Sequence, residues 1–136
     1  MLGVVLKYTP EDLEQIKLVQ FLFLLERQGK IEFFYSNVNE LKSKSDNFQN
    51  MLMGKKLKEM GKRKGVADIT ILTRKKLIFI EIKRKREVLK SGKLSQRDLS
   101  SKEQKSFIKI VNKLSYATGK ICYGFEEAKK FIEEWI

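Results

Sequence analysis

Residues 66–83 read VADITILTRKKLIFIEIK, and this stretch decides the fold. Two runs rich in isoleucine flank a short polar segment, which is the pattern of two β-strands joined by a turn. We take Thr73 to pair with Lys76 across a two-residue turn. In this register Glu81 lies opposite Asp68 on the neighbouring strand, so the hairpin brings two acids together.

Side chains alternate along a strand, so this register gives the hairpin two different faces. One face is filled by five isoleucines, namely Ile69, Ile71, Ile78, Ile80 and Ile82. The other face carries Asp68, Thr70, Leu72, Glu81 and Lys83. Arg74-Lys75 is not a favoured tight-turn pair, so a register shifted by one residue, with the acids apart, is the alternative.

Two carboxylates facing each other across a pair of strands, at about 5 Å, repel each other and need a compensating charge. Lys83 offsets part of this repulsion, and a divalent cation would offset more. Mg²⁺ typically binds one or two protein carboxylates, and it can activate water and stabilise charge on a phosphodiester. Lys83 could hold the attacking water or a phosphate oxygen. The alternative is an ordinary solvent-facing acid and lysine, which the apolar flanks of this strand do not favour.

The overall charge indicates a polyanionic partner. The 136 residues include 29 Lys and Arg against 17 Asp and Glu, a net charge of +12. Such a field attracts phosphate, which favours nucleic acid, although a lysine-rich thermophile composition is the alternative. Histidine is absent, which excludes Ser-His and Cys-His catalysis and histidine metal ligands. Cys122 is alone, which excludes a disulfide framework and a cysteine-rich zinc site.

The remaining sequence predicts helices and further strands around the hairpin. We expect an α/β fold with one mixed β-sheet flanked by helices, forming a single domain over residues 1–136. The expected elements are a helix over 10–28 ended by Gly29, a strand over 31–37, a helix or mobile loop over 48–65, a charged loop over 85–100, a helix over 101–118 stopped by Gly119, a strand over 120–125 and a helix over 126–136. No signal peptide or membrane span is expected, which is consistent with a cytoplasmic protein.

The first helix raises two questions. Glu14 shares an apolar stripe with Leu18, Phe21 and Leu25, so its carboxylate needs a partner in the core. That partner could be a metal at the sheet or the positive helix N-terminus, and Glu11 could serve either purpose.

The run of apolar residues from Phe21 to Leu25 in the first helix also exceeds one stripe. It indicates either a homodimer through this helix or a helix packed between the sheet and the C-terminal helix.

Two basic segments border the predicted hairpin and are candidate DNA contacts. They comprise Lys55, Lys56, Lys58, Lys62, Arg63 and Lys64 before it, and Arg84, Lys85 and Arg86 after it. Such residues would bind phosphates without reading base sequence. The alternative is a solvated charged loop.

Taken in order, NVNE (37–40), MGKRKGVADITIL (60–72), LIFIEIKRK (77–85) and LSSKEQKSFIKIV (99–111) resemble the virus-type replication-repair nuclease family, VRR-NUC, of the PD-(D/E)XK nuclease superfamily. Ala67 stands where that family usually has proline. The resemblance implies the following roles: Asp68, Glu81, Glu14 and the carbonyl of Ile82 as metal ligands, Lys83 as catalytic lysine, and Gln104 as a residue that supports the site.

The resemblance also implies a function. Members of this family are metal-dependent nucleases, so we expect an Mg²⁺- or Mn²⁺-dependent DNA endonuclease acting on branched DNA. The resemblance implies an enzyme similar to the Holliday junction resolvases involved in DNA repair. It also implies a dimer, and a stand-alone domain of the type encoded by viruses and phages. A non-catalytic basic DNA-binding module on the same fold is the alternative. A membrane-surface protein would leave the IEIK motif unexplained.

Overall fold

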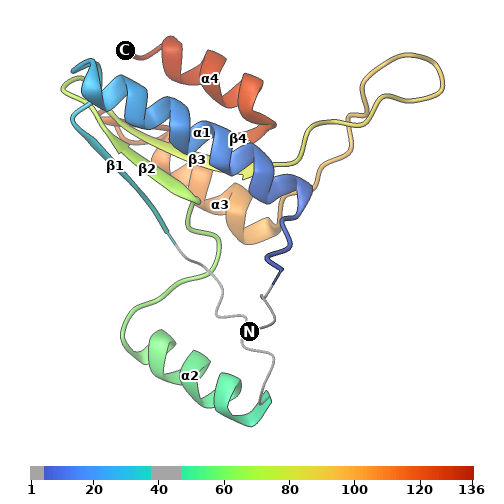
Figure 1. Ribbon diagram of the computed structural model, residues 1–136. Helices are drawn as coiled ribbons and strands as arrows, with labels where there is room; N and C mark the ends of the chain where they lie inside the picture. Colours follow the sequence, from blue (N-terminus) through green and yellow to red (C-terminus); the bar gives the residue numbers. More distant parts are fainter. Residues whose placement is uncertain (1–4, 38–46) are drawn as a thin grey trace.

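The computed structural model describes residues 5–37 and 47–136 (Figure 1). Its elements are α1 (Pro10–Arg27), β1 (Phe33–Ser36), α2 (Asn47–Glu59), β2 (Ile69–Leu72), β3 (Leu77–Lys83), α3 (Lys102–Val111), β4 (Ala117–Tyr123) and α4 (Phe125–Glu133). The sheet has the order β1-β2-β3-β4, in which β3 and β4 are parallel and the other neighbours antiparallel. This is the α/β fold with a mixed sheet that the sequence predicted. Motif residues 38–40 lie outside the described residues.

The register of the β2–β3 hairpin is the predicted one. Ile69 pairs with Ile80, and Ile71 pairs with Ile78. The Thr73 backbone N–H donates to the Lys76 carbonyl at 3.2 Å, which closes the turn. The Thr73 hydroxyl also accepts the N–H of Lys76 at 2.9 Å. The Thr73 side chain therefore stabilises a turn that Arg74 and Lys75, which are not typical turn residues, would not favour by themselves.

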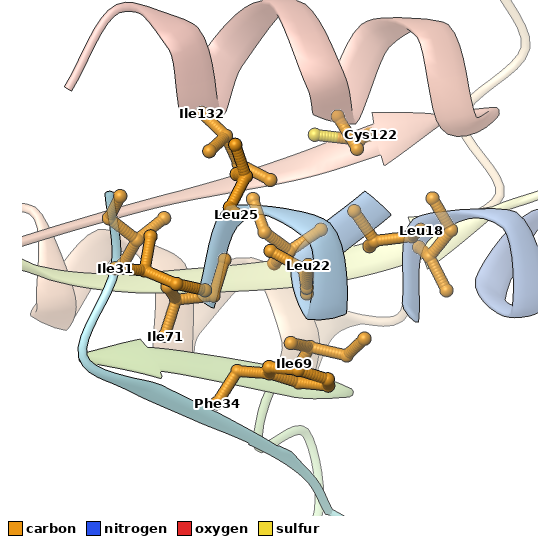
Figure 2. Packing of buried hydrophobic residues seen from close by; sticks show 13 residues of the cluster. Leu18, Leu22, Leu25, Ile31, Phe34, Ile69, Ile71, Cys122 and Ile132 are labelled. Atoms are coloured by element: carbon orange, nitrogen blue, oxygen red, sulfur yellow. The ribbon is translucent and has the colours of Figure 1, made fainter. Parts of the chain in front are cut away.

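The two faces of the sheet are covered by different helices. α1 and α4 pack on one face, and α3 packs on the other against β3 and β4 (Figure 1). Figure 2 shows the leucines of α1 among the isoleucines of the sheet, with Ile132 of α4 beside them. Leu18 and Leu22 are fully buried there. On the other face, the Phe79 ring meets the Phe107 ring of α3 edge-on, with their centroids 5.5 Å apart.

The first helix begins and ends as its sequence predicts. Thr9 caps α1 through a reciprocal pair of hydrogen bonds with Asp12, at 2.9 and 3.1 Å. Gly29 follows the helix with φ of +73°, a conformation that favours glycine. α3 has the same kind of cap, in which Ser101 and Gln104 exchange hydrogen bonds.

The prediction that Gly119 stops a helix is wrong. α3 ends at Val111, and Gly119 lies inside β4. A Cβ at Gly119 would lie 3.0 Å from the Ile108 side chain and 3.2 Å from the Phe79 carbonyl. Glycine is therefore needed because α3 approaches the sheet closely at this point, not because the chain leaves a helix there.

The charged segment before the hairpin is helical. α2 lies apart from the sheet and from the other helices (Figure 1). Its apolar side chains Phe48, Met51 and Leu52 are exposed, as are most of its lysines. None of the described helices is long and apolar enough to cross a membrane.

Candidate active site

Asp68 and Glu81 lie where the hairpin register places them, on the α3 side of the sheet. Asp68 directly precedes β2, and its carboxylate accepts the backbone N–H of Ile82 at 2.9 Å. This bond fixes the Asp68 carboxylate beside the end of β3. Glu81 is only 1% exposed, and neither of its oxygens accepts a hydrogen bond from the residues that the structure describes. The site therefore contains a buried carboxyl group whose polar partner is the Asp68 side chain.

This environment disfavours the charged form of Glu81. Burial raises the pKa of Glu81 to about 10, and the neighbouring Asp68 carboxylate adds to the rise. The Lys83 ammonium acts in the opposite direction but does not outweigh burial. A carboxyl group with a strongly raised pKa beside a second carboxylate is typical of functional sites, because such a pair is unfavourable without a proton or cation.

Lys83 completes the cluster at the end of β3. It lies two residues after Glu81, on the same face of the sheet, and is 8% exposed. Its backbone carbonyl accepts the N–H of Gly124, which links the end of β3 to the start of α4. An ammonium held this deeply in the fold can meet a phosphate oxygen in a poorly hydrated setting, where charge interactions are strong.

Asn37 supports the site in a way that the motif reading did not assign. Its amide group donates to the Ala67 carbonyl at 3.0 Å and to the Thr70 hydroxyl at 3.3 Å. Its backbone N–H donates to the Asp68 carbonyl at 2.7 Å. Asn37 thus holds both sides of Asp68 in place. The available signal was an asparagine immediately after a strand, where such side chains commonly bond to nearby backbone.

The turn before Asp68 packs against the first turn of α3. Gly65 has φ of +85°, and a Cβ there would lie 2.5 Å from the backbone carbonyl carbon of Glu103. Only glycine fits this close approach. Gln104, which the resemblance assigned to support the site, lies in the same turn of α3 and accepts the Ser101 N–H at 2.9 Å. The structure shows Gln104 in this capping role, whereas its support of the acidic cluster stays a prediction.

The structure separates the two acids proposed for α1. Glu14 is buried, as predicted, but its carboxylate accepts the N–H of Phe125 at 3.0 Å and the Lys17 ammonium at 3.3 Å. Burial acts to raise the pKa of Glu14, but these bonds outweigh it and the pKa is lowered. The acid of α1 whose charge acts on Glu81 is Glu11. Which of the two is the helix acid therefore stays a prediction, as does a ligand role for Glu14.

A cavity of about 300 Å³ adjoins the site on the same face of the sheet. It is lined by Ile121 and Tyr123 of β4, which pair with Glu81 and Lys83 in the parallel register. Its other lining residues are Arg86, Gln96, Arg97, Asp98, Ser100 and Lys105. Three of these are cationic and one, Asp98, is acidic and pairs with Lys105, so the lining keeps a positive balance that suits a phosphate backbone.

The predicted DNA contacts fall into groups with different surroundings. Lys55, Lys56 and Lys58 are exposed on α2, and Lys62, Arg63 and Lys64 lie in the turn after it. At the end of β3, Lys85 is exposed and Arg84 is 3.4 Å from the Glu87 carboxylate. Arg86 is only 21% exposed and stacks on Tyr123, so it has structural contacts already.

The donor set fits a divalent cation in part. Asp68 and Glu81 are the one or two carboxylates that Mg²⁺ usually takes from a protein, and the unbonded Glu81 oxygens supply acceptors. Within residues 5–37 and 47–136, however, no group of three or more acidic, cysteine or histidine side chains gathers at one point. A cation here would therefore keep water or substrate oxygens as its other ligands.

Comparison with known proteins agrees with this architecture. Neither the protein-family models nor the curated proteins contain a match to the chain. Among solved structures, the chain is similar to one described as a VRR_NUC domain protein. The TM-score is 0.64 and the identity 19%, over 96% of this chain and 91% of that chain. The chain therefore has the fold of a VRR-NUC domain.

Proposed function

We propose that this protein is a metal-dependent endonuclease that hydrolyses phosphodiester bonds in DNA. The observation that carries this proposal is the buried Glu81 carboxylate, which faces Asp68 and accepts no hydrogen bond from the described chain. Burying two facing carboxyl groups is unfavourable unless a proton or a cation lies between them, and a bound cation would satisfy both. The likeness to a protein described as a VRR_NUC domain protein supports the same activity.

Each residue of the cluster has a separate task in this proposal. Asp68 and Glu81 hold Mg²⁺ or Mn²⁺, together with the Ile82 carbonyl. When bound, the cation supplies water activation and charge stabilisation at the phosphate. The Ile82 N–H keeps the Asp68 carboxylate oriented, at 2.9 Å. Lys83 binds a non-bridging phosphate oxygen and stabilises the negative charge that grows there during attack.

The proposed substrate is DNA with a branch, such as a four-way junction. The net charge of +12 supports a polyanionic substrate, and the cationic cavity beside Glu81 supports binding of the backbone next to the cut. The exposed lysines of α2 would hold phosphates further away. The preference for branches rests on the resemblance to the VRR-NUC family, as does an origin in a virus or phage and a role in DNA repair.

We further propose that the protein acts as a homodimer through α1. One stripe of α1, Leu18, Leu22 and Leu25, is buried between the sheet and α4. A second stripe stays exposed and comprises Leu13, Ile16, Phe23 and Leu24. Phe23 also meets the Phe34 ring, at 4.8 Å between centroids, but packing inside one chain still leaves part of the apolar surface of this helix exposed. A two-fold dimer would place two sites for symmetric cutting of two strands.

A non-catalytic DNA-binding module is the second candidate. The observation in its favour is that two carboxylates, rather than three, meet in the described part of the chain. Under this reading the basic surface binds DNA, and Glu81 stays protonated without a cation. Both candidates predict DNA binding, so only a cleavage assay distinguishes them.

The test is cleavage of a labelled four-way junction and a linear duplex of matched sequence, in Mg²⁺, Mn²⁺ or EDTA. We expect metal-dependent cutting by the wild type and a loss of about 10³-fold or more in Glu81→Gln and in Lys83→Met. The first change removes a proposed ligand of the cation, and the second removes the charge that would stabilise the phosphate during attack. Glu133→Gln, an exposed change on α4, is the matched control. A folded wild type that binds DNA but cuts neither substrate would establish the binding module instead.

A further inference from the structure

The segment after Lys83 forms an arm, which we define as residues 84–98. The sequence predicted a charged loop here, but the arm is a short hairpin that projects away from the sheet (Figure 1). Val88 and Leu94 form an antiparallel bridge. The Ser95 N–H donates to the Glu87 carbonyl at 2.8 Å. The arm therefore has a defined backbone rather than an irregular course.

The base of the arm is fixed to the sheet. The Arg86 guanidinium lies 3.9 Å from the centroid of the Tyr123 ring and donates to the Ser95 carbonyl at 3.3 Å. It also pairs with Glu127 of α4 at 3.5 Å. On the returning side, the Leu99 N–H donates to the Tyr123 hydroxyl at 2.9 Å. These contacts hold the arm in a fixed relation to the strand that carries Glu81.

The tip of the arm combines exposed apolar side chains with positive charge. Val88 is 70% exposed, Leu89 48% and Leu94 54%. Lys90 and Lys93 lie between them in the sequence and are also exposed. Across the arm, residues 84–98, there are six basic residues and two acids. Three apolar side chains held in water among lysines indicate a partner that is both negatively charged and able to offer an apolar surface.

We propose that the tip inserts at the branch point of the DNA substrate, with Leu89 and Leu94 against an exposed base pair and the lysines on the flanking phosphates. This inference rests on the proposed function. A branch point offers such a surface because the terminal base pairs of its arms have faces that no neighbour covers. In a continuous duplex, the same insertion would first have to unstack two base pairs, which is unfavourable.

Because a junction exposes base faces that a duplex does not, the arm would favour binding of a junction over a duplex. Phosphate contacts alone strengthen binding to every DNA and cannot separate a junction from a duplex. Apolar contact with a base face adds affinity only where that face is already open. The rigid base of the arm then sets the distance between the branch and the scissile phosphate, because Lys83 directly precedes the arm.

The test uses the full chain in EDTA, so that binding is measured without cutting. Fluorescence anisotropy would give Kd for a labelled three-way junction and for a linear duplex of the same length. Leu89→Ser and Leu94→Ser are the tip variants, and both side chains are exposed, so circular dichroism should match the wild type. Tyr116→Ser is the matched control, because it is 58% exposed and precedes β4 at the end of the sheet away from Lys83.

We expect the wild type to prefer the junction and each tip variant to lose about tenfold of that preference, while duplex affinity stays unchanged. The control should keep the full preference. Equal loss for both DNAs, or a tip variant that keeps the preference, would overturn the proposal. A dimeric wild type and a monomeric tip variant in sedimentation would also overturn the proposal, because the tip would then contact the second protomer and not the DNA.

The proposal can fail separately from the nuclease activity. A wild type that cuts DNA while its tip variants still prefer the junction leaves the nuclease standing and removes the arm from substrate choice. A wild type that prefers the junction through Leu89, but never cuts, supports the arm and removes the nuclease. A wild type that binds neither DNA overturns both.

Discussion

The most direct consequence of the site geometry is that Glu81 destabilises the metal-free protein at neutral pH. Its pKa is raised to about 10 by burial and by Asp68, whereas its ordinary value is 4.5. Between these values the unfolded chain has released the proton that the folded chain retains. The contribution of Glu81 to stability is therefore fully present below pH 4.5 and is lost as the pH rises toward 10.

The size of the effect follows from proton linkage. One proton corresponds to a slope of about 1.4 kcal/mol per pH unit in the free energy of unfolding. Between pH 5.5 and 8 the metal-free protein should therefore lose about 3 kcal/mol, out of a total of about 5–15 kcal/mol for a small domain. In Glu81→Gln this slope should vanish, because the amide does not titrate and can donate a hydrogen bond to Asp68.

The assay is urea unfolding at pH 5.5 and pH 8, in EDTA and in Mg²⁺, monitored by the fluorescence of the single tryptophan, Trp135. The sequence has no histidine, so few other groups titrate in this range. Mg²⁺ should restore the wild type at pH 8, by about 2.7 kcal/mol at a concentration of 100 times Kd. The same addition should leave Glu81→Gln almost unchanged, since a carboxylate ligand is missing.

Two results would refute this reasoning. A wild type that is as stable at pH 8 as at pH 5.5 in EDTA would mean that Glu81 is not held in an unfavourable charged environment. A slope that persists in Glu81→Gln would assign the titration to another group. Glu133→Gln serves again as the control, and it should retain the wild-type slope.

Three further changes test contacts around the site, each by urea unfolding. Gly119→Ala should destabilise the protein by about 1–3 kcal/mol, because the new Cβ would press on Ile108, 3.0 Å away. Glu14→Ala should cost about 1–2 kcal/mol and speed amide exchange at Phe125, which loses its acceptor at the start of α4. Asn37→Ala should cost about 1–2 kcal/mol by removing two side-chain hydrogen bonds, and it should also slow cleavage by displacing the adjacent acid.

The hairpin register could be predicted because two constraints agree. Five isoleucines at alternate positions must share the buried face, and a shift of one residue would expose one row of them. The turn from Thr73 to Lys76 meets the same requirement. The faces of Asp68 and Glu81 follow directly from this register, so the acidic pair was accessible from the sequence alone.

Other features depend on contacts that no local pattern contains. The spacing of Glu14 placed it on the buried side of α1 but could not reveal that it meets the N–H of Phe125, which is 111 residues away. Gly119 followed a helix-like segment, and only the packing of α3 shows why glycine is needed there. The fixed base of the arm likewise depends on Tyr123, which belongs to a later strand.

One strand, β3, serves stability and function on opposite faces. Ile78, Ile80 and Ile82 fill the core under α1, while Glu81 and Lys83 face the α3 side, and the pleat keeps the two sets apart. An apolar residue at position 81 would remove a buried carboxyl group that faces a second one, and would be neutral or stabilising for the fold alone. Folding therefore gives no reason for a carboxylate at this position. The proposed cation bound by Glu81 and Asp68 would give one, and the arm that continues from the same strand would then connect that site to the shape of the DNA.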